Sequence, residues 1–134
     1  MTICIQNGTL VSGAGTRPGD LLIEDGIIQG VGVGLSGDQN IDAAGCLVFP
    51  GFIDGHTHLD MPVSGTVTAD DFRTGSEAAL VGGTTMLIDF ATQDRGGTLH
   101  DALDVWHGRA DGKCACDYGF HMAVTDWNAR TRRE

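Results

Sequence analysis

The stretch FPGFIDGHTHLD, residues 49–60, decides the fold. An apolar, glycine-flanked run leads into two histidines, and we predict a strand over residues 52–58. Residues i and i+2 of a strand project from one face about 7 Å apart, so His56 and His58 should lie side by side at its carboxyl end. Paired imidazoles there can bind one divalent metal ion. Two chance histidines are the alternative, but β/α folds place active sites at this end.

The first fifty residues contain short β-favouring runs separated by turn residues. The dipeptides at Asn7-Gly8 and Asp25-Gly26 provide the positive φ angles of tight hairpins, and residues 13–19 form a Gly/Pro-rich turn. We therefore predict an antiparallel meander over residues 1–50. The expected strands are 2–6, 9–11, 21–24, 27–33 and 46–49.

Beyond residue 51 strands alternate with amphipathic stretches of helix length. Thr68 is the expected N-cap of a first helix that ends at Gly82-Gly83, and residues 98–110 form a second helix. Strands are expected over residues 84–90 and 116–124, and residues 128–134 begin a third helix. This order predicts β/α units with a parallel sheet over residues 51–134.

Length and charge exclude several classes of protein. The 134 residues are too few for a complete eight-fold β/α barrel, which needs about 250. A formal charge of −10 argues against nucleic acid or anionic membrane as partners, and no apolar run reaches the length of a membrane span. We expect a cytoplasmic protein whose four cysteines stay reduced and structural.

Residues 50–58, PGFIDGHTH, resemble the first-strand signature of the metal-dependent cyclic amidohydrolases. Residues 58–62, 65–72, 82–90 and 116–121 resemble the dihydropyrimidinases and D-hydantoinases. The resemblance implies a small β-sandwich segment over residues 1–50 and the first three β/α units of an incomplete TIM-type barrel over residues 51–134. By this resemblance the chain is the N-terminal portion of an enzyme.

The resemblance also implies two zinc ions, bridged by a hydroxide and a carboxylated lysine. Of the family's ligands, His56 and His58 alone match positions in this chain. The sole lysine, Lys113, precedes the third strand at the opposite end and is a poor candidate for the bridge. We therefore expect no catalytic residue in this chain, and no activity from the chain alone.

The implied reaction opens 5,6-dihydropyrimidine or hydantoin rings to N-carbamoyl amino acids, a step of pyrimidine catabolism, in a homotetramer. Dihydroorotases and allantoinases are the alternative, but Asp60 stands where dihydroorotases carry an arginine and would repel a substrate carboxylate. Non-enzymatic dihydropyrimidinase-related binding proteins lose metal ligands, whereas His56 and His58 are both present. An inactive fragment is a further alternative.

Five other residues have expected supporting roles. Asp54 has the strand parity of the histidines and is expected to form buried hydrogen bonds near the metal ligands. Asp89 ends the second barrel strand, where it either orients a ligand histidine or caps a loop. Asp60, Met61 and Val63 belong to the loop that lines the substrate pocket in the resembling hydantoinases.

Overall fold

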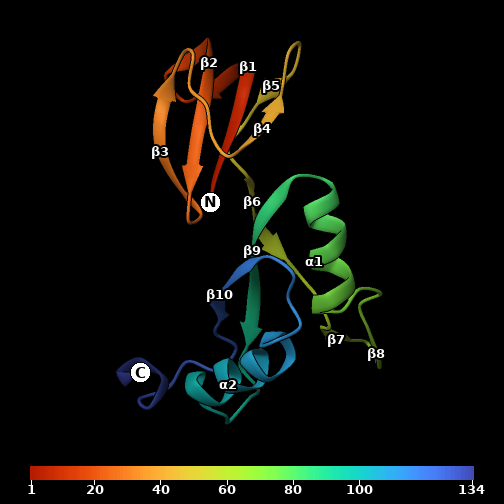
Figure 1. The fold of residues 1–134 in the computed structure, drawn as a ribbon. Coiled ribbons are helices and arrows are strands. Elements are labelled where there is room, and N and C mark those ends of the chain that lie inside the picture. Colours follow the sequence, from red (N-terminus) through yellow and green to blue (C-terminus); the bar gives the residue numbers. More distant parts are fainter. The chain divides into compact units, whose positions relative to one another are not determined.

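The computed structural model describes residues 1–134, which form two compact units, Met1–Pro50 and Gly51–Glu134 (Figure 1). The first unit is a β-sheet and the second is a mixture of strands and helices. Each unit has its own hydrogen-bonded sheet.

The N-terminal unit is a five-stranded sheet with the order β3-β2-β1-β4, in which β5 also pairs with β1. The first three strands form the predicted antiparallel meander, whereas β4 and β5 run parallel to β1. The strands are β1 (Thr2–Ser12), β2 (Gly15–Glu24), β3 (Ile27–Gly32), β4 (Gln39–Asp42) and β5 (Leu47–Val48).

The turn predicted at Asn7-Gly8 is wrong. β1 runs through it, and Asn7 is instead the left-handed residue of a bulge, with φ 61° and a register shift between Ile5 and Gly8. Asparagine tolerates this conformation as well in a bulge as in a hairpin, so the dipeptide alone could not distinguish them. The predicted turn over residues 13–19 is mostly strand, since β2 begins at Gly15, while the Asp25-Gly26 turn is present.

The second unit is built on a parallel sheet with the order β10-β9-β6, as the alternating pattern predicted. Its three strands are β6 (Phe52–Thr57), β9 (Thr84–Thr92) and β10 (Asp117–Ala123). Helix α1 (Phe72–Val81) joins β6 to β9, and α2 (Leu99–Ala110) joins β9 to β10. Between β6 and α1 lies a small hairpin, β7 (Pro62–Val63) with β8 (Thr66–Val67).

Two predicted helix boundaries need correction. The N-cap of α1 is Asp71, whose Oδ1 accepts a hydrogen bond from the Thr74 amide at 2.8 Å. Thr68 instead accepts a hydrogen bond from the Met61 amide at 3.0 Å, which fixes the base of the β7-β8 hairpin. The expected third helix is limited to a 3-10 turn, η1 (Thr131–Arg133).

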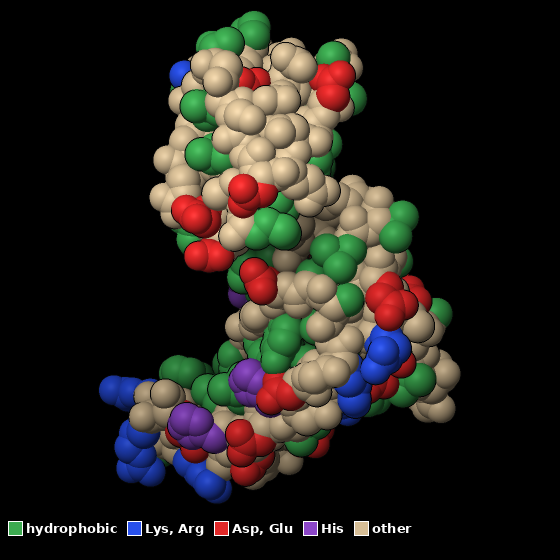
Figure 2. Space-filling view, in the orientation of Figure 1, with side chains coloured by type: hydrophobic (Ala, Val, Ile, Leu, Met, Phe, Trp, Pro, Cys, Tyr) green, Lys and Arg blue, Asp and Glu red, His purple; other side chains and the backbone are tan.

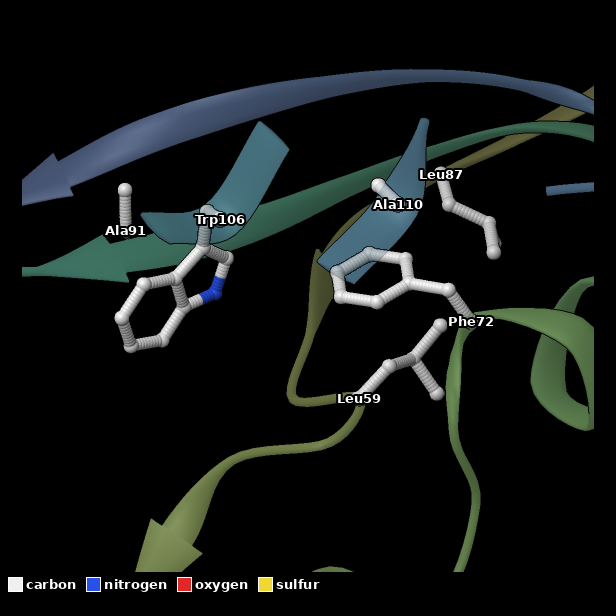
Figure 3. Packing of buried hydrophobic residues seen from close by; sticks show 6 residues of the cluster. All are labelled: Leu59, Phe72, Leu87, Ala91, Trp106 and Ala110. Atoms are coloured by element: carbon white, nitrogen blue, oxygen red, sulfur yellow. The ribbon is translucent and has the colours of Figure 1, made fainter. Parts of the chain in front are cut away.

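The core of the second unit lies between the helices and one face of the sheet. β9 alternates, with Leu87, Asp89 and Ala91 buried and the residues between them only partly buried. Figure 3 shows Leu59 beside Phe72 and Trp106 near Ala91. A Cβ on Gly75 would lie 2.5 Å from Leu59 Cδ2, so any larger residue would displace the Leu59 side chain where α1 packs against it.

Apolar side chains reach the surface of both units (Figure 2). Val33 and Ile27 are among them in the sheet unit, and Val81 and Ile53 in the β/α unit. Neither helix has the length and apolar character needed to cross a bilayer.

Candidate functional site

His56 and His58 converge at the carboxyl end of β6. Their Nε2 atoms lie 3.1 Å apart, and their ring centroids are 5.0 Å apart with the planes nearly perpendicular. His58 follows the last strand residue, Thr57, so the pair spans the point where the strand ends. Both side chains are exposed, and both contact the ring of Phe90 on β9, at centroid distances of 4.5 and 5.3 Å.

This geometry fits a shared metal ion. Two nitrogens bound to one tetrahedral zinc, each ~2.0–2.1 Å from it, lie roughly 3.3 Å apart. The observed 3.1 Å between the Nε2 atoms is close to that value. No group of three or more His, Cys, Asp or Glu side chains converges in the chain.

Asp54 and Asp89 differ in their surroundings. Asp54 is exposed rather than buried as predicted, because the sheet face that carries it is not covered by this chain. Its Oδ1 accepts a hydrogen bond from the main-chain N–H of His56 at 3.1 Å. Asp89 is 1% exposed and touches neither imidazole; it binds Thr57 and Leu59, the residues on either side of His58.

The loop after the histidines is anchored to α2. Asp60 adopts a left-handed conformation with φ 48°. Arg109 donates from Nη1 to the Asp60 carbonyl oxygen at 2.6 Å, and its Nε lies 4.0 Å from Asp60 Oδ2. The charge of Asp60 is therefore partly compensated by Arg109, which sequence reasoning did not anticipate.

A cavity of about 420 Å³ lies between this loop and α2. Met61 and Pro62 line it on the loop side, and Val105, Trp106 and Arg109 on the helix side. Val63 and the two histidines are not part of its lining. Met61 thus shares a cavity with α2 rather than with the two histidines.

His121 lies on the same face of the sheet as the pair. Its Nε2 is 3.2 Å from the carbonyl oxygen of Gly55, and its ring centroid is 4.9 Å from that of Phe90. Three histidine rings therefore surround Phe90. The His121 side chain is exposed on this face, as are those of His56 and His58.

A second polar cluster occupies the opposite end of the parallel sheet. Asp111 accepts hydrogen bonds from Tyr118 and from His107 Nδ1, the latter at 3.0 Å. The bond from Tyr118 lowers the pKa of Asp111 and raises the pKa of Tyr118 to about 12. The cluster links α2 to the start of β10, at the end that serves stability in β/α barrels.

Sequence reasoning missed Thr57, Trp106 and Arg109 as neighbours of the site. Trp106 and Arg109 are three residues apart on α2, and the guanidinium carbon of Arg109 lies 4.4 Å from the Trp106 ring centroid. That spacing places two helical residues on one face, but it does not indicate which loop they contact. No short sequence pattern shows that two residues far apart in the chain are in contact.

Comparison with known proteins assigns the family. Residues 47–122 match the amidohydrolase family. The chain belongs to this family. Amidohydrolases are generally metal-dependent, in keeping with the convergent histidines.

Relatives that are similar to this amidohydrolase chain are far longer than it is. It is 52% identical over 128 residues to a D-hydantoinase from Geobacillus stearothermophilus, covering 94% of this chain and 27% of the relative. It is 42% identical over 139 residues to a dihydropyrimidinase from Rattus norvegicus, covering 98% of this chain and 27% of the relative. The chain thus spans about a quarter of their length.

Solved structures of similar enzymes also match nearly all of this chain and less than a third of their own length. A D-hydantoinase crystal structure superposes with a TM-score of 0.96 at 48% identity, covering 100% of this chain and 30% of that one. The dihydropyrimidinase from Brevibacillus agri NCHU1002 superposes with a TM-score of 0.95 at 44% identity, over 99% of this chain and 29% of that one. A dihydroorotase at 21% identity and a TM-score of 0.59 shares the fold alone.

Proposed function

We propose that the whole protein containing this chain is a cyclic amidohydrolase that opens dihydropyrimidine or hydantoin rings to N-carbamoyl amino acids. The convergence of His56 and His58 at the carboxyl end of β6 carries this proposal. The names of the relatives, D-hydantoinase and dihydropyrimidinase, support the substrate class. Under the same proposal, residues 1–50 belong to a β-sandwich and residues 51–134 are the first three β/α units of a TIM-type barrel.

His56 and His58 are the proposed zinc ligands, each presenting Nε2 to the same point. When bound, a pair of zinc ions supplies an activated water and polarises the ring carbonyl. The remaining ligands and the group that moves the proton to the leaving nitrogen lie outside this chain, so the chain alone is proposed to be inactive. Homotetramer formation and a cytoplasmic location are part of the same proposal.

Asp54, Asp60, Met61 and Val63 have supporting roles in this proposal. The Asp54 carboxylate accepts a hydrogen bond from the main-chain N–H of His56. This contact fixes the backbone position from which the His56 side chain projects. Asp60 places negative charge beside the site, which disfavours substrates with a carboxylate, although Arg109 weakens that effect. Val63 provides exposed apolar surface on the hairpin, and Met61 provides apolar lining for the cavity beside α2.

The kinetics of the whole protein with dihydrouracil, hydantoin and dihydroorotate as substrates test the proposal. We expect zinc-dependent hydrolysis of dihydrouracil and hydantoin to N-carbamoyl products, with a far lower kcat/KM for dihydroorotate. His58→Ala serves as the inactive control, and His100→Ala, an exposed histidine on α2, as the matched active one. Preference for dihydroorotate would refute the substrate class, and zinc-independent hydrolysis would refute the metal site.

A further inference from the structure

Asp89 is the most completely hydrogen-bonded side chain near the site. Oδ2 accepts from the Leu59 amide at 2.7 Å and from the Thr57 hydroxyl at 2.9 Å. Oδ1 accepts from the Phe90 amide at 2.7 Å and from the Trp106 indole N–H at 3.1 Å. The carboxylate is 1% exposed, so these four donors replace the water it would otherwise bind.

Both oxygens of Asp89 must be acceptors. The Leu59 amide and the Trp106 indole can only donate, and they approach different oxygens. An asparagine would therefore place its NH₂ group against at least one donor in either orientation. The site thus distinguishes a carboxylate from an amide of nearly the same shape.

These contacts hold the turn from the side opposite to the histidines. Asp89 binds at positions 57 and 59, and Arg109 binds the carbonyl at position 60. His56 and His58 alternate with the anchored residues and project away from them. Trp106 joins the two anchors, since it donates to Asp89 and stacks under Arg109.

We propose that Asp89 is a positioning residue for the two proposed metal ligands, His56 and His58. Asp89 acts through the main chain of residues 57–59 rather than through an imidazole. By fixing Thr57 and Leu59 it sets the 3.1 Å spacing between the two Nε2 atoms. The inference rests on the proposed function only in taking His56 and His58 as metal ligands. It is independent of which ring is hydrolysed.

Cobalt binding to the whole protein tests this role without reference to catalysis. We expect Asp89→Asn to weaken Co²⁺ binding ~10- to 100-fold and to change the visible d–d spectrum of the bound ion, because the imidazoles no longer converge. Ser76→Ala is the matched control, since the Ser76 hydroxyl is also buried but binds the Phe72 carbonyl oxygen and the Ala115 amide, neither of which belongs to the turn. It should lower the thermal midpoint while leaving Co²⁺ affinity and spectrum unchanged.

Thr57→Val provides a second variant if Asp89→Asn does not fold. It removes one donor to Asp89 without changing the shape of the side chain, and should weaken Co²⁺ binding ~3- to 10-fold. In the metal-free protein it should also speed hydrogen exchange at the Leu59 amide, which reports the anchor itself.

Wild-type Co²⁺ affinity and spectrum in a folded Asp89→Asn or Thr57→Val protein would overturn the proposal. Equal losses in Ser76→Ala would overturn it too, since the effect would then be general destabilisation. A protein that binds Co²⁺ but hydrolyses no cyclic ureide would refute the proposed function and leave this inference standing.

Discussion

Asp20 in the N-terminal unit and Asp89 in the second unit are both buried carboxylates that fix an irregular piece of main chain. Asp20 accepts from the Asn7 amide at 2.8 Å and from the Leu35 amide at 3.0 Å, and so holds the bulge in β1. Asp89 holds the turn after β6. The two residues are 4% and 1% exposed.

The difference lies in what the anchored segment carries. The bulge at Asn7 is next to strand residues that pair within the sheet, so fixing it stabilises the sheet. The turn held by Asp89 carries two imidazoles on its other side, so fixing it also fixes the proposed metal ligands. A buried carboxylate with main-chain donors is therefore evidence of a positioned segment, and the residues on that segment decide whether the position serves function.

The largest expected effect follows from removing a ligand. His58→Ala should reduce Co²⁺ affinity by more than the ~100-fold that loss of a supporting hydrogen bond costs, and should abolish ring hydrolysis by the whole protein. Metal titration and product assays measure both effects. Unchanged metal content after dialysis would contradict the assignment of His58 as a ligand.

The next largest effect distinguishes the role of Asp20 from that of Asp89. Asp20→Asn should lower the thermal midpoint by roughly 5 °C, because one of two main-chain donors then faces an amide NH₂. Co²⁺ affinity should stay at its wild-type value, in contrast to Asp89→Asn. A joint loss of metal binding in Asp20→Asn would show that the two anchors are not functionally distinct.

Acid should weaken the N-terminal anchor in a predictable direction. The hydrogen bond from the Asn7 amide lowers the pKa of Asp20 below its usual 3.8. The folded-state pKa is then below the unfolded-state value, so this stabilisation is complete above the unfolded-state pKa and is lost as pH falls through the folded-state pKa. The protection factors of the Asn7 and Leu35 amides, which are hydrogen-exchange rates corrected for the intrinsic dependence on pH, should fall at the acid end between about pH 6 and about pH 3. Asp20→Asn should remove that acid-dependent change.

The smallest effect concerns Asp60. Asp60→Asn should narrow the kcat/KM gap between dihydrouracil and dihydroorotate about two- to fivefold, because a repulsive charge is removed. Arg109 Nε lies 4.0 Å from the Asp60 carboxylate and already offsets part of that charge, which limits the effect. An unchanged ratio would remove Asp60 from the explanation of substrate choice.

The sequence predicted the parts of the molecule that depend on local patterns. The parallel order of the β/α unit and the positions of α2 and β9 follow from apolar periodicity and caps. Asn7 was misassigned because a left-handed residue suits both a hairpin and a bulge, and only pairing with β2 decides between them. Thr68 and Asp71 are both good N-caps, and the hairpin contact of Thr68 with Met61 determines which one caps α1.

The candidate site likewise has features that the sequence predicts and features that it does not. The His-x-His spacing on a strand is visible in the sequence, and the pair converges as that spacing suggests. The anchors are not visible, since Asp89 is 30 residues from Leu59 and Arg109 is 49 residues from Asp60. The closeness of such partners is fixed by packing of α2 on the sheet and not by any short pattern.

A zinc-edge anomalous difference map from crystals of the whole protein tests the central assignment most directly. We expect a peak bound by Nε2 of both His56 and His58 at ~2.0–2.1 Å, on the side of the turn opposite to Asp89. Anomalous density bound by neither imidazole, or no peak in crystals grown with zinc, would contradict the account.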